Sequence, residues 1–272
     1  MRSIRKPLFL FALLLLCAAI LAGCGGAETS APADGPDPAE DLSRVLERGV
    51  LVVGVTDYPP LDYLEDGSWT GFDAELAAMF AGWIGVREVS FVEIEWDRKV
   101  ELLLSGEIDV IWNGMTKTPA LEKEIDCSSP YLSNVEVIVL PKDQFERYDK
   151  AENSYHLLFA VEDGSYAQEL AKELKLRTIA YDNMHAVFEA VAGRKCDAAI
   201  ADRHFAERLT APGAEFDSLR YGFPFGEEAL CVGLRKGSSL TARVDDFLLV
   251  NFKNGEIPAL ADRYDLRDSL RR

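Results

Sequence analysis

Residues 49–80 read GVLVVGVTDYPPLDYLEDGSWTGFDAELAAMF, and this stretch decides the fold. It opens with a short continuous apolar run at residues 50–53, as expected of a parallel strand that is covered on both faces. After a loop rich in Pro, Asp and Gly, large apolar residues recur at helical spacing, namely Phe72, Leu76, Met79, Phe80 and Trp83. The stretch therefore predicts a strand, a loop and an amphipathic helix that stops at Gly85.

The sequence on either side continues this alternation. A short helix from Ser43 is expected to stop at Gly49, and a helix at residues 97–104 is expected between strands at residues 89–94 and 108–112. A second unit has expected strands at residues 157–161, 177–181 and 197–201 and helices at residues 166–174 and 184–192. An apolar strand at residues 230–234 and amphipathic helices at about 239–253 and 256–263 follow. Two successive α/β units predict an α/β protein with two lobes.

The N-terminus has the features of an export signal. Basic residues precede an apolar run at residues 8–21, which is shorter than the about 20 apolar residues of a membrane-spanning helix. The run ends in Leu-Ala-Gly-Cys, which resembles the lipobox of bacterial lipoproteins, whose cysteine becomes the lipidated first residue. We therefore expect a signal peptide at residues 1–23 and lipidation at Cys24, with ordinary secretion and nearby cleavage as the alternative.

Composition separates a tether from the globular part. Residues 24–41 are rich in Gly, Pro, Ala, Asp and Glu and contain no bulky apolar residue, so we expect a flexible tether there. Residues 1–23 carry three Lys or Arg and no acidic residue, so their removal changes the formal net charge from −17 to −20. A field of that sign repels nucleic acid and anionic lipid surfaces, and we expect no nucleic-acid partner.

The cysteines and histidines indicate no metal or cofactor. Cys127, Cys196 and Cys231 remain beside Cys24 after the signal is removed, and their spacing fits no zinc pattern. A disulfide between Cys196 and Cys231 and buried free thiols are both open. The three histidines are scattered, so we expect no metal site and no cofactor.

The opening stretch and six later stretches carry a resemblance to a known family. The later stretches are WDRKVELLLSGEIDVIWNGMTKTP (96–119), EIDCSSPYL (124–132), VEDGSYAQEL (161–170), AGRKCDAAIAD (192–202), VGLRKGSSL (232–240) and NGEIPALADRYDL (254–266). In order and spacing, from residue 44 to residue 266, they resemble family 3 of the ABC-transporter substrate-binding proteins, the polar amino acid receptors.

The resemblance implies a type II periplasmic binding-protein fold, in which each lobe is a sheet flanked by helices and two hinge strands join the lobes. Lobe 1 would comprise residues 42–135 and 230–272, and lobe 2 would comprise residues 136–229. The implied function is that of an extracytoplasmic, lipid-anchored receptor, on the cell surface or the periplasmic face. It would close its lobes on a small polar solute and deliver it to the permease of an ABC importer. We expect a monomer without catalytic groups.

The resemblance also implies a ligand pocket. Its expected residues are Asp57, Tyr58, Trp96, Asn113, Gly114, Thr116, Gly164, Ser165, Tyr166 and Asp202. Tyr58 and Trp96 match the aromatic walls around the ligand's side chain, with ordinary core packing as the alternative. Asp202 matches the carboxylate that pairs with an α-ammonium group, with a helix N-cap as the alternative.

The other pocket residues are expected to offer polar groups. Asn113, Gly114 and Thr116 match strand-end positions that present backbone and hydroxyl groups to the ligand's polar head, and a mere turn is the alternative. Gly164 and Ser165 open the helix at residues 166–174, where free N–H groups and the helix dipole favour an anion.

Three positions depart from the family pattern. Leu121 stands where the family has the arginine that binds the ligand's α-carboxylate, and an alkyl group cannot replace a guanidinium. Tyr166 replaces a small hydroxyl residue, and Cys127 stands where an aromatic residue is usual. Acidic residues at or beside the cleft are Asp57, Glu162, Asp163 and Asp202.

These departures suggest a ligand other than a standard free α-amino acid, for example an amine, a betaine-like compound or a modified amino acid. Lys117, Lys123 or Arg203 could instead reach the cleft and replace the arginine. Two further functions stay open. One is an exported dehydratase that acts on cyclohexadienyl acids, and the other is a degenerate receptor that serves as a surface sensing or interaction module.

Overall fold

Nine strands form one hydrogen-bonded sheet in the computed structural model, which describes residues 35–148 and 150–271. The path runs β4-β1-β5-β11-β7-β10-β8-β9, and β6 pairs with β11 at its side. The strands are β1 (Val50–Val55), β4 (Glu88–Glu93), β5 (Val110–Thr116), β6 (Asp126–Cys127), β7 (Leu132–Pro141), β8 (Leu158–Glu162), β9 (Arg177–Tyr181), β10 (Ala198–Asp202) and β11 (Leu219–Leu234). A separate hairpin consists of β2 (Tyr63–Glu65) and β3 (Ser68–Thr70).

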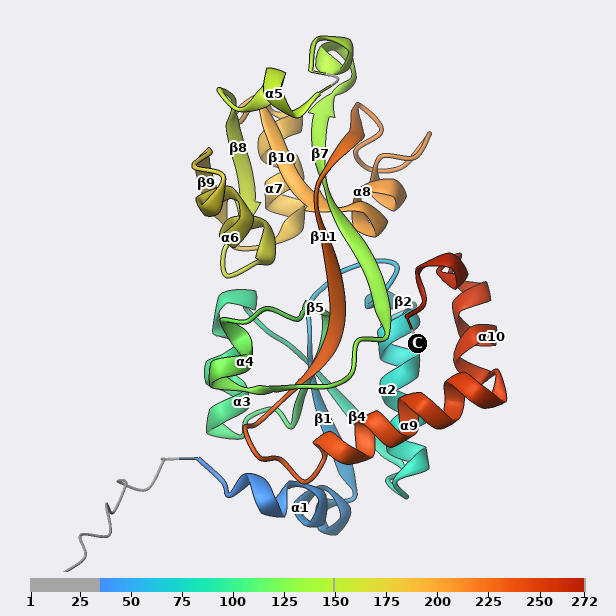
Figure 1. Ribbon diagram of the computed structural model, residues 1–272. Coiled ribbons are helices and arrows are strands. Elements are labelled where there is room, and N and C mark those ends of the chain that lie inside the picture. The colour runs from blue at the N-terminus through green and yellow to red at the C-terminus, as the bar shows by residue number, and fades with distance from the viewer. Residues whose placement is uncertain (1–34, 149, 272) are drawn as a thin grey trace, which may run out of the picture. The chain divides into compact units, whose positions relative to one another are not determined.

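The sheet has a parallel part at each end and an antiparallel centre. β1 pairs in parallel with β4 and β5, and β8 pairs in parallel with β9 and β10. The long strands β7 and β11 pair with each other in antiparallel fashion and run from one end to the other (Figure 1). The two ends are the two lobes that the sequence predicts, and the expected lobe boundaries fall within β7 and β11. Because β7 and β11 pair with strands of both lobes, one continuous sheet replaces the expected sheet per lobe.

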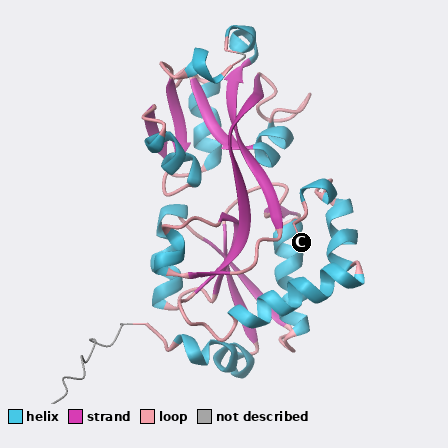
Figure 2. Ribbon diagram, in the orientation of Figure 1, coloured by secondary structure: helices cyan, strands magenta, loops and turns pink. Residues whose placement is uncertain are grey.

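Helices cover the sheet in both lobes (Figure 2). The first lobe carries α1 (Asp41–Arg48), α2 (Phe72–Trp83), α3 (Lys99–Ser105), α4 (Leu121–Glu124), α9 (Thr241–Asn254) and α10 (Glu256–Arg263). The second lobe carries α5 (Ala151–Ser154), α6 (Tyr166–Glu173), α7 (Met184–Ala192) and α8 (Arg203–Leu209). Short 3₁₀ helices are η1 (Pro38–Glu40), η2 (Trp96–Arg98), η3 (Lys142–Arg147) and η4 (Arg267–Ser269). Every strand and helix predicted from periodicity is present, with its ends shifted by a few residues at most, except for the strand at residues 230–234.

That strand is only the last part of β11. The preceding residues contain Gly222, Pro224 and Gly226, and the pairing of β11 with β7 shifts register on either side of Pro224. Proline and glycine in a sequence argue against the prediction of a strand, and proline in a sheet is found at edges and bulges. The bulges accommodate these residues, so the strand continues where the sequence pattern stops.

An aromatic cluster holds the first lobe together beneath the site. The ring of Phe80 in α2 lies 5.8 Å from that of Trp112 in β5 and 5.5 Å from that of Phe247 in α9. All three side chains are buried. This packing fixes the carboxyl end of β5, where three of the predicted pocket residues lie.

The expected signal peptide and Cys24 lie outside the described residues. Within the range assigned to the tether, the structure already has η1 and the start of α1. Asp41 is fully buried, where its carboxylate accepts hydrogen bonds from the Arg235 guanidinium (Nη2 to Oδ1, 3.0 Å) and from the Ser238 hydroxyl (2.6 Å). This charge-assisted pairing attaches α1 to the first lobe. No helix of the described residues is long and apolar enough to cross a membrane.

All three cysteines of the described residues are free thiols. Cys196 and Cys231 are buried, so the buried-thiol alternative holds and the bridge between them is not formed. Cys196 instead lies 3.6 Å from the Tyr181 hydroxyl, in the second lobe.

Candidate functional site

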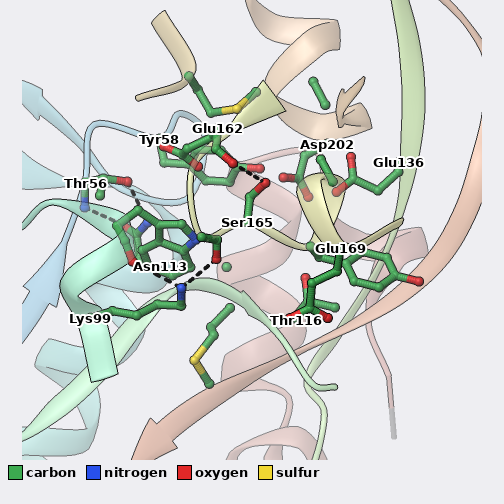
Figure 3. Close-up of a pocket in the computed structure, with 18 of the residues that line it drawn as sticks. Thr56, Tyr58, Lys99, Asn113, Thr116, Glu136, Glu162, Ser165, Glu169 and Asp202 are labelled. Carbon is green, nitrogen blue, oxygen red and sulfur yellow. Dashed lines mark hydrogen bonds between the residues drawn. The ribbon is translucent and has the colours of Figure 1, made fainter. Parts of the chain in front are cut away.

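A cavity lies between the two lobes, where β5 of the first lobe faces β10 and α6 of the second (Figure 3). Its volume is about 40 Å³. Nine of the ten residues expected at the pocket line it: Tyr58, Trp96, Asn113, Gly114, Thr116, Gly164, Ser165, Tyr166 and Asp202. Asp57 does not line it; its exposed carboxylate lies 4.0 Å from the imidazole of His185.

Two aromatic side chains form part of the cavity wall, and each also packs against the protein. The Tyr58 ring stacks on Phe205 of α8, with centroids 5.0 Å apart and an angle of 16° between the planes. The Lys99 ammonium lies 4.5 Å from the centre of the Trp96 ring. One face of each ring is therefore already covered by the protein.

The end of β5 is held by hydrogen bonds that use several of the expected ligand-binding groups. The Asn113 amide donates to the Thr56 hydroxyl (2.7 Å) and accepts from the Thr56 N–H (2.8 Å). The N–H of Gly114, whose φ is +59°, donates to Asp73 at 2.7 Å. Asn113 and Gly114 thus shape the wall, while the Asn113 side chain and the Gly114 N–H already have partners within the protein.

Asp73 is the buried anchor of this strand end. Besides the Gly114 N–H, its Oδ2 accepts a hydrogen bond from the Tyr131 hydroxyl at 2.6 Å. Burial raises the pKa of Asp73 to about 6, although the bonds from Tyr131 and Gly114 oppose the rise. Asp62 lies beside it, and burial followed by the charge of Asp73 raises the pKa of Asp62 well above its ordinary value.

Three carboxyl groups meet at the border between the cavity and the hinge strands. Glu136 of β7, Asp202 of β10 and Glu228 of β11 each place an oxygen within 4.8 Å of the others. The amide of Asn134 donates to both Asp202 and Glu228, and the Thr116 hydroxyl donates to Glu228. We call Glu136, Asp202 and Glu228 the carboxylate triad.

Glu136 is the unpartnered member of the carboxylate triad. It is 2% exposed, it lines the cavity, and its Oε2 has no hydrogen-bond partner within the described residues. Burial, followed by the charge of Glu228, raises the pKa of Glu136 well above its ordinary value. The same two causes raise the pKa of Asp202.

Lys99 links the two lobes. Its ammonium donates to the carbonyl of Gly164 in the second lobe (2.7 Å) and to that of Trp96 in the first (3.1 Å). Burial lowers the pKa of Lys99 to about 8, although nearby carboxylates, Glu162 first, oppose the fall. Burial also raises the pKa of Glu162 to about 8, and Lys99 opposes that rise. Figure 3 shows the ammonium directed to its two carbonyl acceptors.

The loop before α6 packs closely against the first lobe. Gly164 has φ +69°, and a Cβ added there would lie 2.7 Å from the Cα of Asp97. The Gly164 N–H donates to Gln168, and the Ser165 hydroxyl caps α6 by accepting from the Gln168 N–H (3.2 Å). The Gly164 N–H expected to meet an anion is therefore satisfied within the protein.

The arginine that the family resemblance implies has no substitute in the cavity wall. Leu121 lines the cavity, as its position in the sequence implies. Of the three basic residues that could have replaced the arginine, Lys117 pairs with Glu122 (3.1 Å), while Lys123 and Arg203 are exposed and away from the cavity. Among the described residues that line the cavity, Lys99 is the one basic residue.

Residues 51–267 match the family described as bacterial extracellular solute-binding proteins, family 3. The chain belongs to this family. The L-cystine-binding protein TcyJ of Escherichia coli (strain K12) is 29% identical to this family 3 protein over 231 residues, which are 82% of this chain and 85% of that one.

Two solved structures share the fold of this family 3 protein. A mutant of ArgBP from T. maritima has a TM-score of 0.76 and 27% identity, and the match covers 83% of this chain and 99% of that chain. An ancestral amino acid-binding protein, described as a precursor of cyclohexadienyl dehydratase, has a TM-score of 0.75 and 30% identity, with 82% and 98% covered. The two-lobed α/β fold implied by the sequence is thereby confirmed.

Sequence reasoning missed four charged residues of this site in the family 3 protein: Asp73, Lys99, Glu136 and Glu228. Asp73 lies in the first turn of a helix, where acidic residues are common for the helix dipole alone. Glu136 is the one charged residue in the apolar run of β7, and this was the available signal. Neither Lys99 nor Glu228 has a local signal, because Gly164, which accepts from Lys99, and Asn134, which donates to Glu228, are distant in sequence.

Proposed function

We propose that this family 3 protein is an extracytoplasmic lipoprotein that captures a small polar solute, amino-acid-like or amine-like, and delivers it to the permease of an ABC importer. The observation that carries the proposal is the cavity itself. It lies between the two lobes and is lined by aromatic, hydroxyl and carboxyl groups, which is the composition of a site for a small polar ligand. The relatives of this chain include an L-cystine-binding protein and an arginine-binding protein, which supports a solute of this size.

The enclosed volume supports a binding cycle in which the lobes separate and close. About 40 Å³ is roughly three times the space that one buried water needs. A solute the size of an amino acid therefore requires the lobes to part, with β7 and β11 as the connecting strands. Closing would restore the contacts of Lys99 with Gly164 and of Tyr58 with Phe205, and it would present the closed surface to a permease.

Thermal melting and calorimetry against panels of amino acids and amines test this function. A ligand at 100 times its Kd adds about 2.7 kcal/mol to the stability of the folded state, so the true solute raises Tm by several degrees. Native mass spectrometry of the purified protein would identify a solute that remains bound during purification. A melting temperature that no member of a broad panel changes would contradict solute capture and favour the surface sensing or interaction module.

We propose no catalytic activity for this protein, and its relatives TcyJ and ArtP are named as binding proteins. The resemblance to a precursor of cyclohexadienyl dehydratase makes the dehydratase the enzyme to test. We expect no turnover when the protein is incubated with prephenate or arogenate, because both substrates carry carboxylates that the cavity has no arginine to receive. Product formation in that assay would replace the proposed function with an enzymatic one.

A further inference from the structure

The carboxylate triad is a group of closely packed acids with no basic side chain from the described part of the chain beside them, and burial together with the charge of Glu228 raises the pKa values of Glu136 and Asp202. No Lys, Arg or His of the described residues forms an ion pair with Glu136, Asp202 or Glu228. Glu136 and Glu228 are 2% and 5% exposed, so water does not screen them fully. Buried charges in proteins are normally paired, because the desolvation of an unpaired charge is costly. Without a cation these acids avoid that cost by staying protonated, whereas a cation from outside the chain would favour their ionised form and be bound by it.

The triad offers the three acceptors that a primary ammonium group requires. A primary ammonium has three donors in a tetrahedral arrangement, and at the about 2.8 Å of a charge-assisted bond its three acceptors lie about 4.6 Å apart. The nearest oxygens of the triad lie no more than 4.8 Å from one another, and Asp202 and Glu228 are close enough to share a hydrogen bond, which an entering ammonium would replace. A quaternary ammonium has no N–H donor, so it would leave the buried Oε2 of Glu136 without a hydrogen bond.

The hydrogen bonds around the triad disfavour a metal ion. Calcium takes six to eight oxygen ligands, so it would need the lone pairs of all three carboxylates. The amide of Asn134 already donates to Asp202 and Glu228, and the Thr116 hydroxyl donates to Glu228. These donors direct hydrogen atoms at the oxygens that a metal ion would require, whereas an ammonium needs only one lone pair from each carboxylate.

The rest of the cavity, as far as the described residues line it, has no guanidinium that would receive a carboxylate. Leu121 lines the wall where an arginine would bind one. The ammonium of Lys99 is occupied by two carbonyl oxygens and by the face of Trp96. A carboxylate in this cavity would face Glu162 and the triad with Lys99 as the one cation among the described residues of the wall, which is electrostatically unfavourable.

Resting on the proposed capture of a solute, we propose that the ligand is a primary amine without a carboxylate, and that Glu136, Asp202 and Glu228 together bind its ammonium group. The aromatic and apolar wall of Tyr58, Trp96 and Leu121 packs against the carbon chain of the amine. This assignment gives Glu136 the hydrogen-bond partner that it lacks within the chain.

Two matched sets of probes test the ligand class by calorimetry. The first set is pentylamine, norleucine and pentyltrimethylammonium, which differ only in the added carboxylate or the N-methyl groups. The second set is 1,5-diaminopentane and lysine. We expect the amine of at least one set to bind at least about tenfold more tightly than its carboxylate-bearing and quaternary counterparts, since a tenfold change equals about 1.4 kcal/mol. Calcium chloride alone is expected to leave Tm unchanged.

Glu136→Gln tests the triad without changing the size of the side chain. It should lower the affinity for the amine by at least about tenfold, because a buried charge-assisted contact is lost. Its urea unfolding midpoint should stay equal or rise, since an unpartnered buried carboxylate is removed. Glu227→Gln removes the same charge from the exposed neighbour of Glu228, and it should change the affinity by less than about twofold because exposed charges are screened by salt.

The outcomes separate this proposal from the proposed function. If an amino acid binds as tightly as its amine, or if only carboxylate-bearing or quaternary solutes bind, the protein is still a receptor and the ligand class is wrong. A rise in Tm with calcium alone would make the triad a metal site and overturn the proposal. An equal loss of affinity in Glu136→Gln and Glu227→Gln would also overturn it. If no solute of any class binds, the proposed function itself fails.

Discussion

At the scale of single residues, buried carboxyl groups shape the site from both lobes. In the first lobe, Asp73 accepts from Gly114 and Tyr131 and so positions the end of β5. Its neighbour Asp62 is also buried, and both carboxyl oxygens of Asp62 lack a hydrogen-bond partner within the described residues. Two neighbouring buried carboxyl groups, such as those of Asp62 and Asp73, cannot both ionise at low energetic cost. Their protonation is therefore linked to the stability of the fold.

The pH dependence of stability should report on Asp73. Its pKa is about 6 in the folded protein against 3.8 as the reference, so between those values the folded state binds more protons than the unfolded state. Asp73 therefore stabilises the fold most below about pH 4, and this contribution is lost as the pH rises through 6. Asp73→Asn cannot titrate, so its unfolding free energy does not fall in this way. Measured by urea unfolding, the unfolding free energy of the variant should rise relative to that of the wild type by up to about 1.4 kcal/mol per pH unit over this range. A stability difference that stays constant from pH 4 to pH 7 would contradict this account.

At the scale of elements, the loop between β8 and α6 decides how closely the lobes approach. Gly164 has a left-handed backbone, its carbonyl accepts from Lys99, and the position of its missing Cβ is taken by Asp97 of the other lobe. Gly213 is a matched control in the second lobe, with φ +81° and no atom within 4 Å of an added Cβ. Both glycines meet the same backbone demand, but only Gly164 faces the other lobe.

Gly164→Ala and Gly213→Ala should therefore differ in ligand affinity. Each variant should lose about 1 kcal/mol of unfolding free energy, because alanine is disfavoured at positive φ. Only Gly164→Ala should bind ligand more weakly, by at least about tenfold, because the methyl group keeps the lobes apart; each tenfold equals about 1.4 kcal/mol. Calorimetry with the solute identified by the panel, together with urea unfolding of both variants, measures the two effects. Equal affinities in the two variants would show that closure does not depend on this contact.

At the scale of the whole molecule, an acidic protein is expected to be held at a membrane by a lipid rather than by charge. The formal net charge is −17 for the full sequence, and anionic lipid surfaces repel a field of that sign. Cys24→Ala should therefore move the protein from the membrane fraction to the soluble fraction, since acyl chains supply the membrane-binding energy. Cys17→Ala is the control, because Cys17 is expected to leave with the signal peptide. Membrane association that survives in Cys24→Ala would contradict a lipid anchor at this residue.

The sequence by itself determined the elements and their class. Apolar runs and helical spacing, such as those of residues 49–80, involve residues only a few positions apart. They can therefore be recognised in the sequence without knowledge of the three-dimensional structure. The motifs also sufficed to imply the family. Nine of the ten pocket residues expected from that resemblance line one cavity in the structure. The replacement of the family's arginine by Leu121 could also be recognised from the sequence, because the adjacent motif fixes the position of this residue.

Only the tertiary structure decided which polar groups are free to meet a ligand. The Asn113 side-chain amide donates a hydrogen bond to Thr56. The N–H groups of Gly114 and Gly164 donate to Asp73 and Gln168, respectively. The carboxylate triad comes from β7, β10 and β11, which are separated in sequence and adjacent only in the sheet. Electrostatic and hydrogen-bond partners depend on distance in space and on burial, and a linear sequence encodes neither of these locally.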